Sequence, residues 1–384
     1  MIVELEIASL AAGGDGVARD ATGRVTFVPR TAPGDRVRAR IVQQTKTFAR
    51  GELIELLAAQ ASRVEPPCSH FLEGCGGCQW LHVGRTEQLV AKQAIAAGAL
   101  RKLEGLVVHP IATPAPALGW RRRARFHVGG GAVGLYQLGT HRIVRIDHCP
   151  QLEPALDAVL AKIASATPPA GELALLLGYA GDIAVGTTRP WRGAERLVGT
   201  ARIRGLTCGN EIHGDPVIEV EPGLWGGPWD FAQSSADGNR AVIDLARVAT
   251  GPGPGTLLEL YVGAGNLTRG LVADGWTVTA SDVTRPARPI GATYLEGAAG
   301  DVVQRVGGPI DAIVLDPPRT GAAEAIDGIV RLAPRVITYV SCDQATLARD
   351  AARLVLAGYR ATDAWPIDLM PQTSHVEIVL RLER

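Results

Sequence analysis

The stretch TLLELYVGAGNLTRGLVADGWTVTASD, residues 256–282, decides the fold predicted for the second half of this 384-residue chain. An apolar strand comes first, then a turn with two glycines, a helical segment and a second strand that ends in aspartate. Apolar strands and helices keep alternating down to HVEIVLRLE at residues 375–383. This rhythm is typical of a doubly wound parallel α/β sheet that helices cover on both faces. Ligands of such sheets bind at the carboxyl ends of the strands.

Glycines and a carboxylate stand at the first of these strand ends. Gly263 and Gly265 allow a tight turn between strand and helix, where backbone N–H groups face a ligand. Asp282 ends the next strand, a suitable place for a carboxylate that accepts hydrogen bonds from ribose hydroxyls. The dinucleotide pattern G-x-G-x-x-G is not met, since the next glycine is Gly270. Many α/β turns are glycine-rich for packing only, so a cofactor loop and a packing turn both stay open at this point.

Two further strand ends carry a carboxylate and a thiol. Asp316 opens DPPR, whose tandem prolines remove N–H donors and leave carbonyl and carboxylate oxygens for a planar base. Its fourth residue is Arg319, where amino-group methyltransferases usually have an aromatic residue, so that chemistry is disfavoured. Cys342 follows the strand RVITYVS, and Asp343 is the expected N-cap of the next helix, whose N-terminus lowers a thiol pKa. A buried, inert cysteine is the usual alternative, but the position opposite DPPR favours a nucleophile.

The last predicted strand begins with a second carboxylate. Glu377 has His375 two residues earlier, on the same face of the strand. Its carboxylate is either a base or an exposed residue of an edge strand, and position alone favours the edge residue. Cys208 has no comparable context, so we interpret it as structural.

Four other cysteines, Cys68, Cys75, Cys78 and Cys149, form C-x6-C-x2-C with a distant fourth member. The opening MIVELEIASL has acidic residues where a signal peptide has basic ones, and no apolar run approaches membrane-spanning length. We therefore expect a soluble, cytoplasmic protein without structural disulfides and without a membrane partner. An all-thiolate set suits an iron–sulfur cluster or zinc. The spacing differs from the C-x3-C-x2-C string of radical enzymes that use S-adenosylmethionine.

Composition and charge predict several folded domains and one basic region. Hydrophobic residues make up 46% of the chain and charged residues 20%, with a formal net charge of zero. Residues 85–145 nevertheless contain ten Lys or Arg against two Glu, most densely in GWRRRARF at residues 119–126. A phosphate-binding patch and a solvated strand face explain this run about equally well. The candidate nucleic-acid contacts are Arg121, Arg122, Arg123, Arg125 and Arg319.

Turn signals divide the chain into three expected domains. The first sixty residues alternate short β-patterns with GGDG and APGD turns, which predicts a small barrel. EPPC at residues 65–68 breaks that pattern. We expect a β-barrel at residues 1–62, a central α+β domain with the four cysteines at 63–230, and the α/β domain at 231–384. A monomer is the default expectation.

Together these strings resemble the RNA (uracil-5-)-methyltransferase family, especially its bacterial ribosomal RNA members, over nearly the whole chain. GGDGVAR, FVPRTAPGD and RVEPPC resemble a TRAM RNA-binding domain. CSHFLEGCGGCQWLH with IDHCPQL resembles the family's four-iron–four-sulfur ligand set. FAQSSADGN and LELYVGAGN resemble its cofactor strings, and DPPRTG, YVSCDQATLARD and PQTSHVE resemble its catalytic strings.

The resemblance implies a Rossmann-like S-adenosylmethionine methyltransferase that modifies uridine at its 5-carbon, most readily in 23S rRNA and alternatively in tRNA. It implies a nucleophile at Cys342, a base at Glu377, and a 4Fe-4S cluster, with zinc as the alternative, on Cys68, Cys75, Cys78 and Cys149. The implied cofactor contacts are Gln233, Tyr261, Gly263, Gly265, Asp282 and Asp316.

Departures from the family pattern leave two rival functions open. The family usually has Glu at the position of Asp282, and VTRPARPIGATYLEG at residues 283–297 lacks its usual Asn-rich helix. Asp-Gln also follows Cys342 where Asn-Pro is usual. A non-catalytic RNA-binding or assembly factor that keeps the fold is one rival. An iron–sulfur redox enzyme is the other, although the chain lacks a recognisable flavin or nicotinamide loop.

Overall fold

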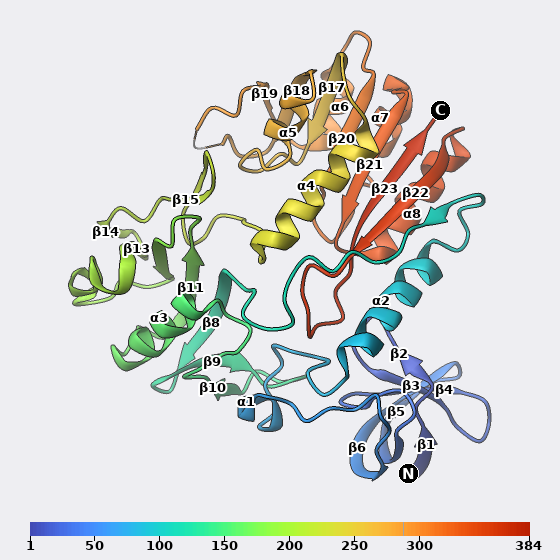
Figure 1. Cartoon of the computed structure of the whole chain (residues 1–384), viewed down its shortest axis with the longest axis vertical. Coiled ribbons are helices and arrows are strands. Elements are labelled where there is room, and N and C mark those ends of the chain that lie inside the picture. The colour runs from blue at the N-terminus through green and yellow to red at the C-terminus, as the bar shows by residue number, and fades with distance from the viewer. Residues whose placement is uncertain (287) are drawn as a thin grey trace.

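The computed structural model describes residues 1–286 and 288–384, which form three main sheets and one small hairpin (Figure 1). Residue 287, within the segment noted above as departing from the family, lies outside the described residues. No helix in the described part of the chain is long and apolar enough to cross a membrane.

The N-terminal sheet curls into a barrel because its two edge strands come from adjacent stretches of chain. The strand order is β1-β5-β6-β4-β3-β2, yet only residues 7 and 8 separate the two edge strands. Its core includes Leu5, Val28 and Val37, all buried. The strands are β1 (Ile2–Glu6), β2 (Ser9–Leu10), β3 (Gly16–Arg19), β4 (Val25–Val28), β5 (Arg36–Gln44) and β6 (Phe48–Ala58).

The central sheet has one helix-covered face and one face without a helix packed on its core residues. Its order is β10-β9-β8-β11-β12-β13-β14, and the core beneath helix α3 includes Phe126, Leu160 and Leu175. The strands are β8 (Arg123–Gly129), β9 (Ala132–Tyr136), β10 (Ile143–Arg145), β11 (Gly171–Leu177), β12 (Ile183–Thr187), β13 (Ile203–Cys208) and β14 (Glu211–Gly214). Helical segments are α1 (Ser69–Leu72), α3 (Pro154–Ser165), η1 (Ala194–Leu197) and η2 (Thr200–Arg202), and the hairpin is β15 (Ile218–Glu221) and β16 (Leu224–Gly226).

The C-terminal sheet is the expected doubly wound α/β layer. Its order is β19-β18-β17-β20-β21-β23-β22-β7. Neighbouring residues of one strand belong to different cores, with Leu257 in one and Leu258 in the other, because both faces are buried. The strands are β7 (Val107–Val108), β17 (Gly255–Leu260), β18 (Trp276–Asp282), β19 (Thr293–Glu296), β20 (Ala312–Leu315), β21 (Val336–Ser341), β22 (Arg360–Ile367) and β23 (Glu377–Glu383).

Helices cover both faces of this sheet (Figure 1). Val242 of α4 and Leu271 of α5 belong to one core, whereas Val302 of α6, Ile326 of α7 and Leu347 of α8 belong to the other. The helices are α4 (Ala236–Thr250), α5 (Thr268–Ala273), α6 (Ala299–Arg305), α7 (Ile326–Leu332) and α8 (Gln344–Leu356). Two apolar faces covered by helices confirm the fold class predicted from the alternating pattern.

Two features differ from the expected arrangement. Strand β23 runs antiparallel to both of its neighbours, so the sheet is not parallel throughout; the nine-residue connection 368–376 returns the chain beside β22 instead of crossing a face. Helix α2 (Arg85–Leu100) and β7 also lie against the C-terminal sheet, since β7 pairs with β22 and Ala96 joins the α8 core. The three-domain division stays a prediction. Residues 85–108 pack on the third part, and Ala91 also packs on Trp80 and Val83 of the second part and on Leu10 and Ala32 of the barrel.

Candidate functional site

A cavity of about 770 Å³ opens at the carboxyl ends of the C-terminal strands. This volume is within the usual range for small-molecule sites. Most residues that the sequence singled out line it together: Gln233, Tyr261, Gly263, Asp282, Asp316, Arg319, Cys342 and Glu377. Gly265 does not line the cavity. Its φ of +90° and the contact that a Cβ would make with Ile290 at 2.6 Å explain the glycine there instead.

The glycine turn and Asp282 are joined by a hydrogen bond. The N–H of Gly263 donates to Asp282 Oδ2 at 2.8 Å, and Gly263 has a φ of +54°. Tyr261, the first residue after β17, has a φ of +61°, and its hydroxyl donates to Glu324 at 2.5 Å. The carboxylate of Asp282 is thereby fixed beside the turn, and its other oxygen accepts a hydrogen bond from Thr284 N–H at 3.2 Å.

Glu259 is a buried acidic residue of the cavity wall that the sequence analysis missed. It lies in β17, is 2% exposed, and its Oε2 has no hydrogen-bond partner among the described residues. Burial raises its pKa to about 8. Buried carboxylates without partners are rare, and a cationic ligand in the cavity would supply one. The sequence offered one signal for this residue, a single acidic side chain in the middle of an apolar strand.

Three adjacent strands bring Asp316, Cys342 and Glu377 to one wall of the cavity. Asp316 follows β20, Cys342 follows β21, and Glu377 begins β23, in the sheet order β20-β21-β23. Ser341 pairs with Ile378 across β21 and β23, which sets the thiol and the Glu377 carboxylate at the same end of that strand pair. Burial and the neighbouring Asp316 charge raise the pKa of Glu377 well above its usual value, and burial raises the pKa of Asp316 to about 7.

The thiol of Cys342 does not have the lowered pKa expected from the helix that follows it. Burial, then the charges of Glu377 and Asp316, raise its pKa to about 11, against the opposing effects of the Arg319 charge and of a backbone hydrogen bond at Cys342. Asp343 is the N-cap of α8, as expected, and its carboxylate accepts from the N–H groups of residues 345 and 346 at 3.1 and 2.9 Å. The cap occupies two of the free N–H groups of the helix end, so these two do not stabilise the thiolate.

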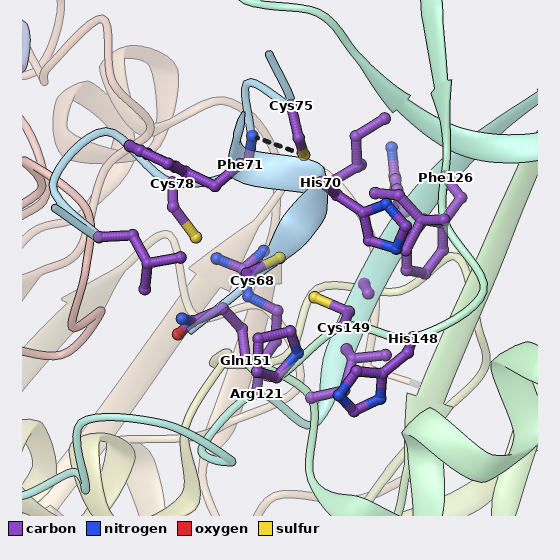
Figure 2. Close-up of a pocket in the computed structure, with 18 residues that line it drawn as sticks. Cys68, His70, Phe71, Cys75, Cys78, Arg121, Phe126, His148, Cys149 and Gln151 are labelled. Atoms are coloured by element: carbon purple, nitrogen blue, oxygen red, sulfur yellow. Dashed lines mark hydrogen bonds between the residues drawn. The ribbon is translucent and has the colours of Figure 1, made fainter. Parts of the chain in front are cut away.

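The four remaining predicted cysteines surround a second, smaller pocket (Figure 2). Cys75 accepts a hydrogen bond from Gly77 N–H at 3.4 Å. Burial raises the pKa of Cys78 to about 12 and also raises the pKa of Cys75 and Cys149. Within residues 1–286 and 288–384, no three His, Cys, Asp or Glu side chains converge closely enough to bind one metal ion. The sulfurs therefore line a shared cavity instead of meeting at a point.

Two buried donors without partners face this cysteine pocket. Arg121 Nε and Gln151 Nε2 make no hydrogen bond among the described residues, and both side chains line the pocket. Trp120 donates to Gln151 Oε1 at 2.7 Å, which fixes the amide with its NH₂ group free. Buried unpaired donors suit an anionic group, as a thiolate-ligated cluster would be.

The predicted arginine run splits between three environments. Arg121 lines the cysteine pocket, and Arg122 is buried with its guanidinium 2.6 Å from Glu221. Arg123 lies over the ring of Phe231 at 5.8 Å, and Arg125 lies over Trp229 at 5.5 Å. Alternation along β8 places these last two on the face opposite the α3 core.

Aromatic side chains continue that face of the central sheet. Phe231 is 66% exposed and belongs to the rim of the large cavity. Farther along, the rings of His127 and Tyr136 stack with centroids 3.7 Å apart. The sequence showed the arginines but not these partners, since residues 229 and 231 lie about a hundred positions downstream of β8.

Comparisons with known proteins give consistent matches. Residues 2–54 match the TRAM domain family. The chain is 32% identical over 433 residues to the 23S rRNA (uracil(1939)-C(5))-methyltransferase RlmD of Alkalilimnicola ehrlichii, covering 99% of this chain and 96% of the relative. It is 31% identical to the RlmD of Chromohalobacter salexigens, covering 99% and 89%.

A solved structure has the same fold over the whole chain. It is the Pyrococcus abyssi tRNA (uracil-54, C5)-methyltransferase in complex with S-adenosyl-L-homocysteine, with a TM-score of 0.79 and 20% identity, covering 99% of this chain and 100% of that one. This likeness confirms the predicted fold class, including the arrangement of barrel, central sheet and α/β sheet.

Removing the charge of Arg319 should raise the pKa of Cys342 further. Alkylation requires the thiolate, so Arg319→Ala should react with iodoacetamide up to about tenfold more slowly near neutral pH, since one pKa unit changes the thiolate fraction tenfold. In both proteins the rate should keep rising with pH because the thiol is mostly protonated. Mass spectrometry of the Cys342 peptide measures the rate.

The matched control for this experiment is Arg335→Ala, at the opposite end of β21, which should leave the rate unchanged. Faster alkylation of the Arg319→Ala protein would contradict the assignment of that charge.

Proposed function

Since this chain belongs to the RNA (uracil-5-)-methyltransferase family and methylates uracil in RNA at its 5-carbon, we propose that its substrate is a uridine of 23S rRNA and its methyl donor S-adenosylmethionine. One observation carries the proposal: Asp316, Cys342 and Glu377 share one wall of a cavity whose other wall is a glycine turn. A tRNA substrate is the second candidate, favoured by the full-length likeness to the tRNA enzyme.

The large cavity suits S-adenosylmethionine in size and charge. This cofactor carries a methyl group on a positively charged sulfur, which makes the methyl group electrophilic. The fixed carboxylate of Asp282 would accept its ribose hydroxyls, and the unpartnered carboxylate of Glu259 would accept its ammonium group. Gln233, Tyr261 and Asp316 complete the proposed contacts.

Cys342 would act as a nucleophile because the 5-carbon of uracil reacts too weakly alone. Thiolate addition to the 6-carbon forms a C–S bond and moves the ring electrons onto an enolate, whose 5-carbon takes up the methyl group. Glu377 then removes the 5-proton. The electron pair left behind breaks the C–S bond and frees the thiolate. Glu377, now protonated, gives the proton to solvent, and the enzyme then returns to its starting state.

The raised pKa of Glu377 suits its proposed role as base. A buried carboxylate holds a proton more tightly than a solvated one, which increases the driving force for taking the 5-proton. A cationic ligand in the cavity would lower the pKa of both Glu377 and Asp316 by charge attraction. Glu377 would then be ionised when substrate is bound.

Substitution of the two reactive groups tests this mechanism. Cys342→Ala should lose methylation of 23S rRNA entirely while it still binds S-adenosylmethionine. Glu377→Gln should form a covalent RNA–protein adduct that survives denaturing electrophoresis, because the last step lacks its base. Transfer of radiolabelled methyl groups and gel mobility measure the two effects.

Cys208→Ala, which removes a buried cysteine of the central sheet, is the control and should remain active. Normal turnover by the Cys342→Ala protein would rule out the proposed mechanism. Methylation of tRNA transcripts but not of 23S rRNA would overturn the proposed target. Absence of cofactor binding in the native protein would favour a non-catalytic RNA-binding factor.

We also propose that flanking single-stranded RNA follows the face of the central sheet opposite α3, along β8 and β9 and beside the hairpin that covers β11 and β12. Its target base must leave any duplex to be attacked, and stacking compensates part of that cost. Phe231 stands at the cavity rim, and the Arg123, Arg125 and Tyr136 side chains continue away from it. Aromatic rings with interleaved arginines are typical of single-strand binding surfaces. Arg121 and Arg122 are engaged elsewhere, so the surface rests on Arg123, Arg125 and Arg319.

Arg125→Ala should weaken RNA binding without changing S-adenosylmethionine binding. Loss of one phosphate contact should reduce the salt dependence of log Kd by about 0.7. Arg196→Ala is the control, because that arginine is exposed on η1, which packs on the α3 side of the sheet. Equal effects of the two substitutions would contradict the proposed surface.

The cysteine pocket is proposed to hold a 4Fe-4S cluster. A Zn–S bond of about 2.3 Å would require the four sulfurs to meet around one ion. The side chains instead surround a cavity with two unpaired donors, Arg121 and Gln151, which fits a larger anionic group. Its ligands would be Cys68, Cys75, Cys78 and Cys149. We expect a structural role, because a cysteine thiolate then occupies each of the four ligand positions and none is left open for a substrate.

Anaerobic purification should yield about four irons and four sulfides per chain by chemical analysis. Cys75→Ser should lose them and bind RNA more weakly, whereas Cys208→Ser should keep them. A content of one zinc and no sulfide per chain would contradict the proposed cluster and favour a zinc site.

A further inference from the structure

Residues 368–376, which connect β22 to β23 and lead into Glu377, form a buried loop. Asp368, Leu369 and Val376 are at most 2% exposed, and Gln372 is 7% exposed. Connections usually lie on the surface, because a buried one must find partners for its backbone polar groups inside the protein. The partners of this loop come from distant parts of the chain.

Helix α2 supplies the first set of partners. Gln88 is fully buried, and its amide both donates to Gln372 Oε1 at 2.8 Å and accepts from Gln372 N–H at 3.1 Å. One turn later, Lys92 is fully buried, pairs with Asp368 at 2.5 Å and donates to Met370 O at 3.0 Å. Lys92 thus holds residues 368 and 370 of the loop, and Gln88 holds residue 372. Side chains of one helix therefore fix the first half of the loop.

The cysteine-rich segment supplies the second set. Trp80 N–H donates to Gln372 O at 3.0 Å, and Gln79 Oε1 accepts from Ser374 N–H at 3.4 Å. Gln372 has a φ of +67°, a strained conformation for a residue other than glycine, and all four of its polar groups are hydrogen-bonded. These bonds hold Gln372 in a backbone conformation that it rarely adopts alone.

A third contact ties the loop to the helix that follows the thiol. Gln344, in the first turn of α8, donates through its side chain to Val376 O at 2.6 Å. Val376 directly precedes Glu377, and Gln344 lies two residues beyond Cys342. The spacing between the thiol and the Glu377 carboxylate is therefore set by the loop on one side and by α8 on the other.

From these contacts we infer that Gln88, through Gln372, is a positioning residue for the Glu377 carboxylate. The inference rests on the proposed function, because it assigns Gln88 to the step in which Glu377 removes the 5-proton. Gln88 lies on α2 and does not line the reaction cavity. Its amide also lies within hydrogen-bonding distance of Trp80 O at 3.1 Å and Val83 O at 2.8 Å, and Trp80 itself holds Gln372 O. None of these groups lines the cavity, so cofactor binding and thiolate addition should not depend on Gln88.

The inference predicts a defect confined to one step. Replacing Gln88 with methionine closely keeps the side-chain volume and removes both hydrogen bonds to Gln372, together with those to Trp80 O and Val83 O. Small misplacements of a catalytic group reduce rates by up to about a hundredfold. We expect kcat to fall about tenfold or more, with KM for RNA and Kd for S-adenosylmethionine unchanged.

The distinguishing measurement is the covalent RNA–protein adduct under turnover conditions. If proton removal alone is slowed, the adduct should accumulate in the Gln88→Met enzyme, as in Glu377→Gln, because the preceding steps are intact. A purely structural role for Gln88 would lower activity without raising the steady-state amount of adduct. Denaturing gel electrophoresis with labelled 23S rRNA separates these outcomes.

Gln93→Met is the matched control on the same helix. Gln93 makes two hydrogen bonds, but they join α2 to the segment after β7, through His109 O and Ile111 N–H. Its substitution should leave kcat and the amount of adduct unchanged. An equal fall in kcat in both variants, or a fall in Gln88→Met without adduct, would overturn the inference.

A second variant covers the case in which Gln88→Met fails to fold. Gln372→Asn introduces a residue that tolerates positive φ better than glutamine does, and it shortens the side chain whose amide meets Gln88. The Gln372→Asn enzyme should accumulate the same adduct, and a lack of adduct would count against the inference. If Glu377→Gln itself forms no adduct, the proposed function fails. If Glu377→Gln forms it and both loop variants do not, only this inference fails.

Discussion

The shared desolvation of acidic groups around one cavity is the constraint on which the site depends. Glu259, Asp316, Glu377 and the Cys342 thiol all have raised pKa values, and burial is the largest cause for each. Carboxylates in a shared low-dielectric space repel one another, so some of them hold protons in the free protein. A single cationic ligand would relieve this repulsion at every group, which couples the ionisation of thiol and base to occupancy of the cavity.

The parallel sheet explains why these groups meet and why the sequence could predict most of them. Strand ends of a doubly wound sheet share one edge, so a polar residue directly after an apolar strand is placed there by topology alone. Asp282, Asp316 and Cys342 are of this type. Glu259 was missed because a carboxylate inside a strand is expected on a solvated face, and only the covering of both sheet faces shows it to be buried.

The features that sequence could not supply depend on contacts between distant segments. The sequence shows the helix that directly follows Cys342, and on that basis the thiol pKa was expected to fall. The carboxylates that raise it, Asp316 and Glu377, belong to other strands, so local sequence does not show their proximity. Within five residues the arginine run passes from the cysteine pocket, through the buried ion pair of Arg122 and Glu221, to the sheet face opposite α3. The partners of these arginines are distant in sequence, so spacing could not show them. Residues 85–108 likewise follow the cysteine turn in sequence but pack on the C-terminal sheet.

The loop before Glu377 was partly predictable from its local sequence and partly depends on contacts with distant segments. Its string PQTSHVE predicts a catalytic residue, yet the polar groups that hold it come from α2 and from the residues just after Cys78. Trp80 also donates through its indole to Gly14 O of the barrel, at 2.9 Å. Barrel, cysteine pocket and base are thus connected by buried hydrogen bonds to one short segment. Because these hydrogen bonds are buried, the conformation of the segment that carries Glu377 depends on contacts with the N-terminal half of the chain.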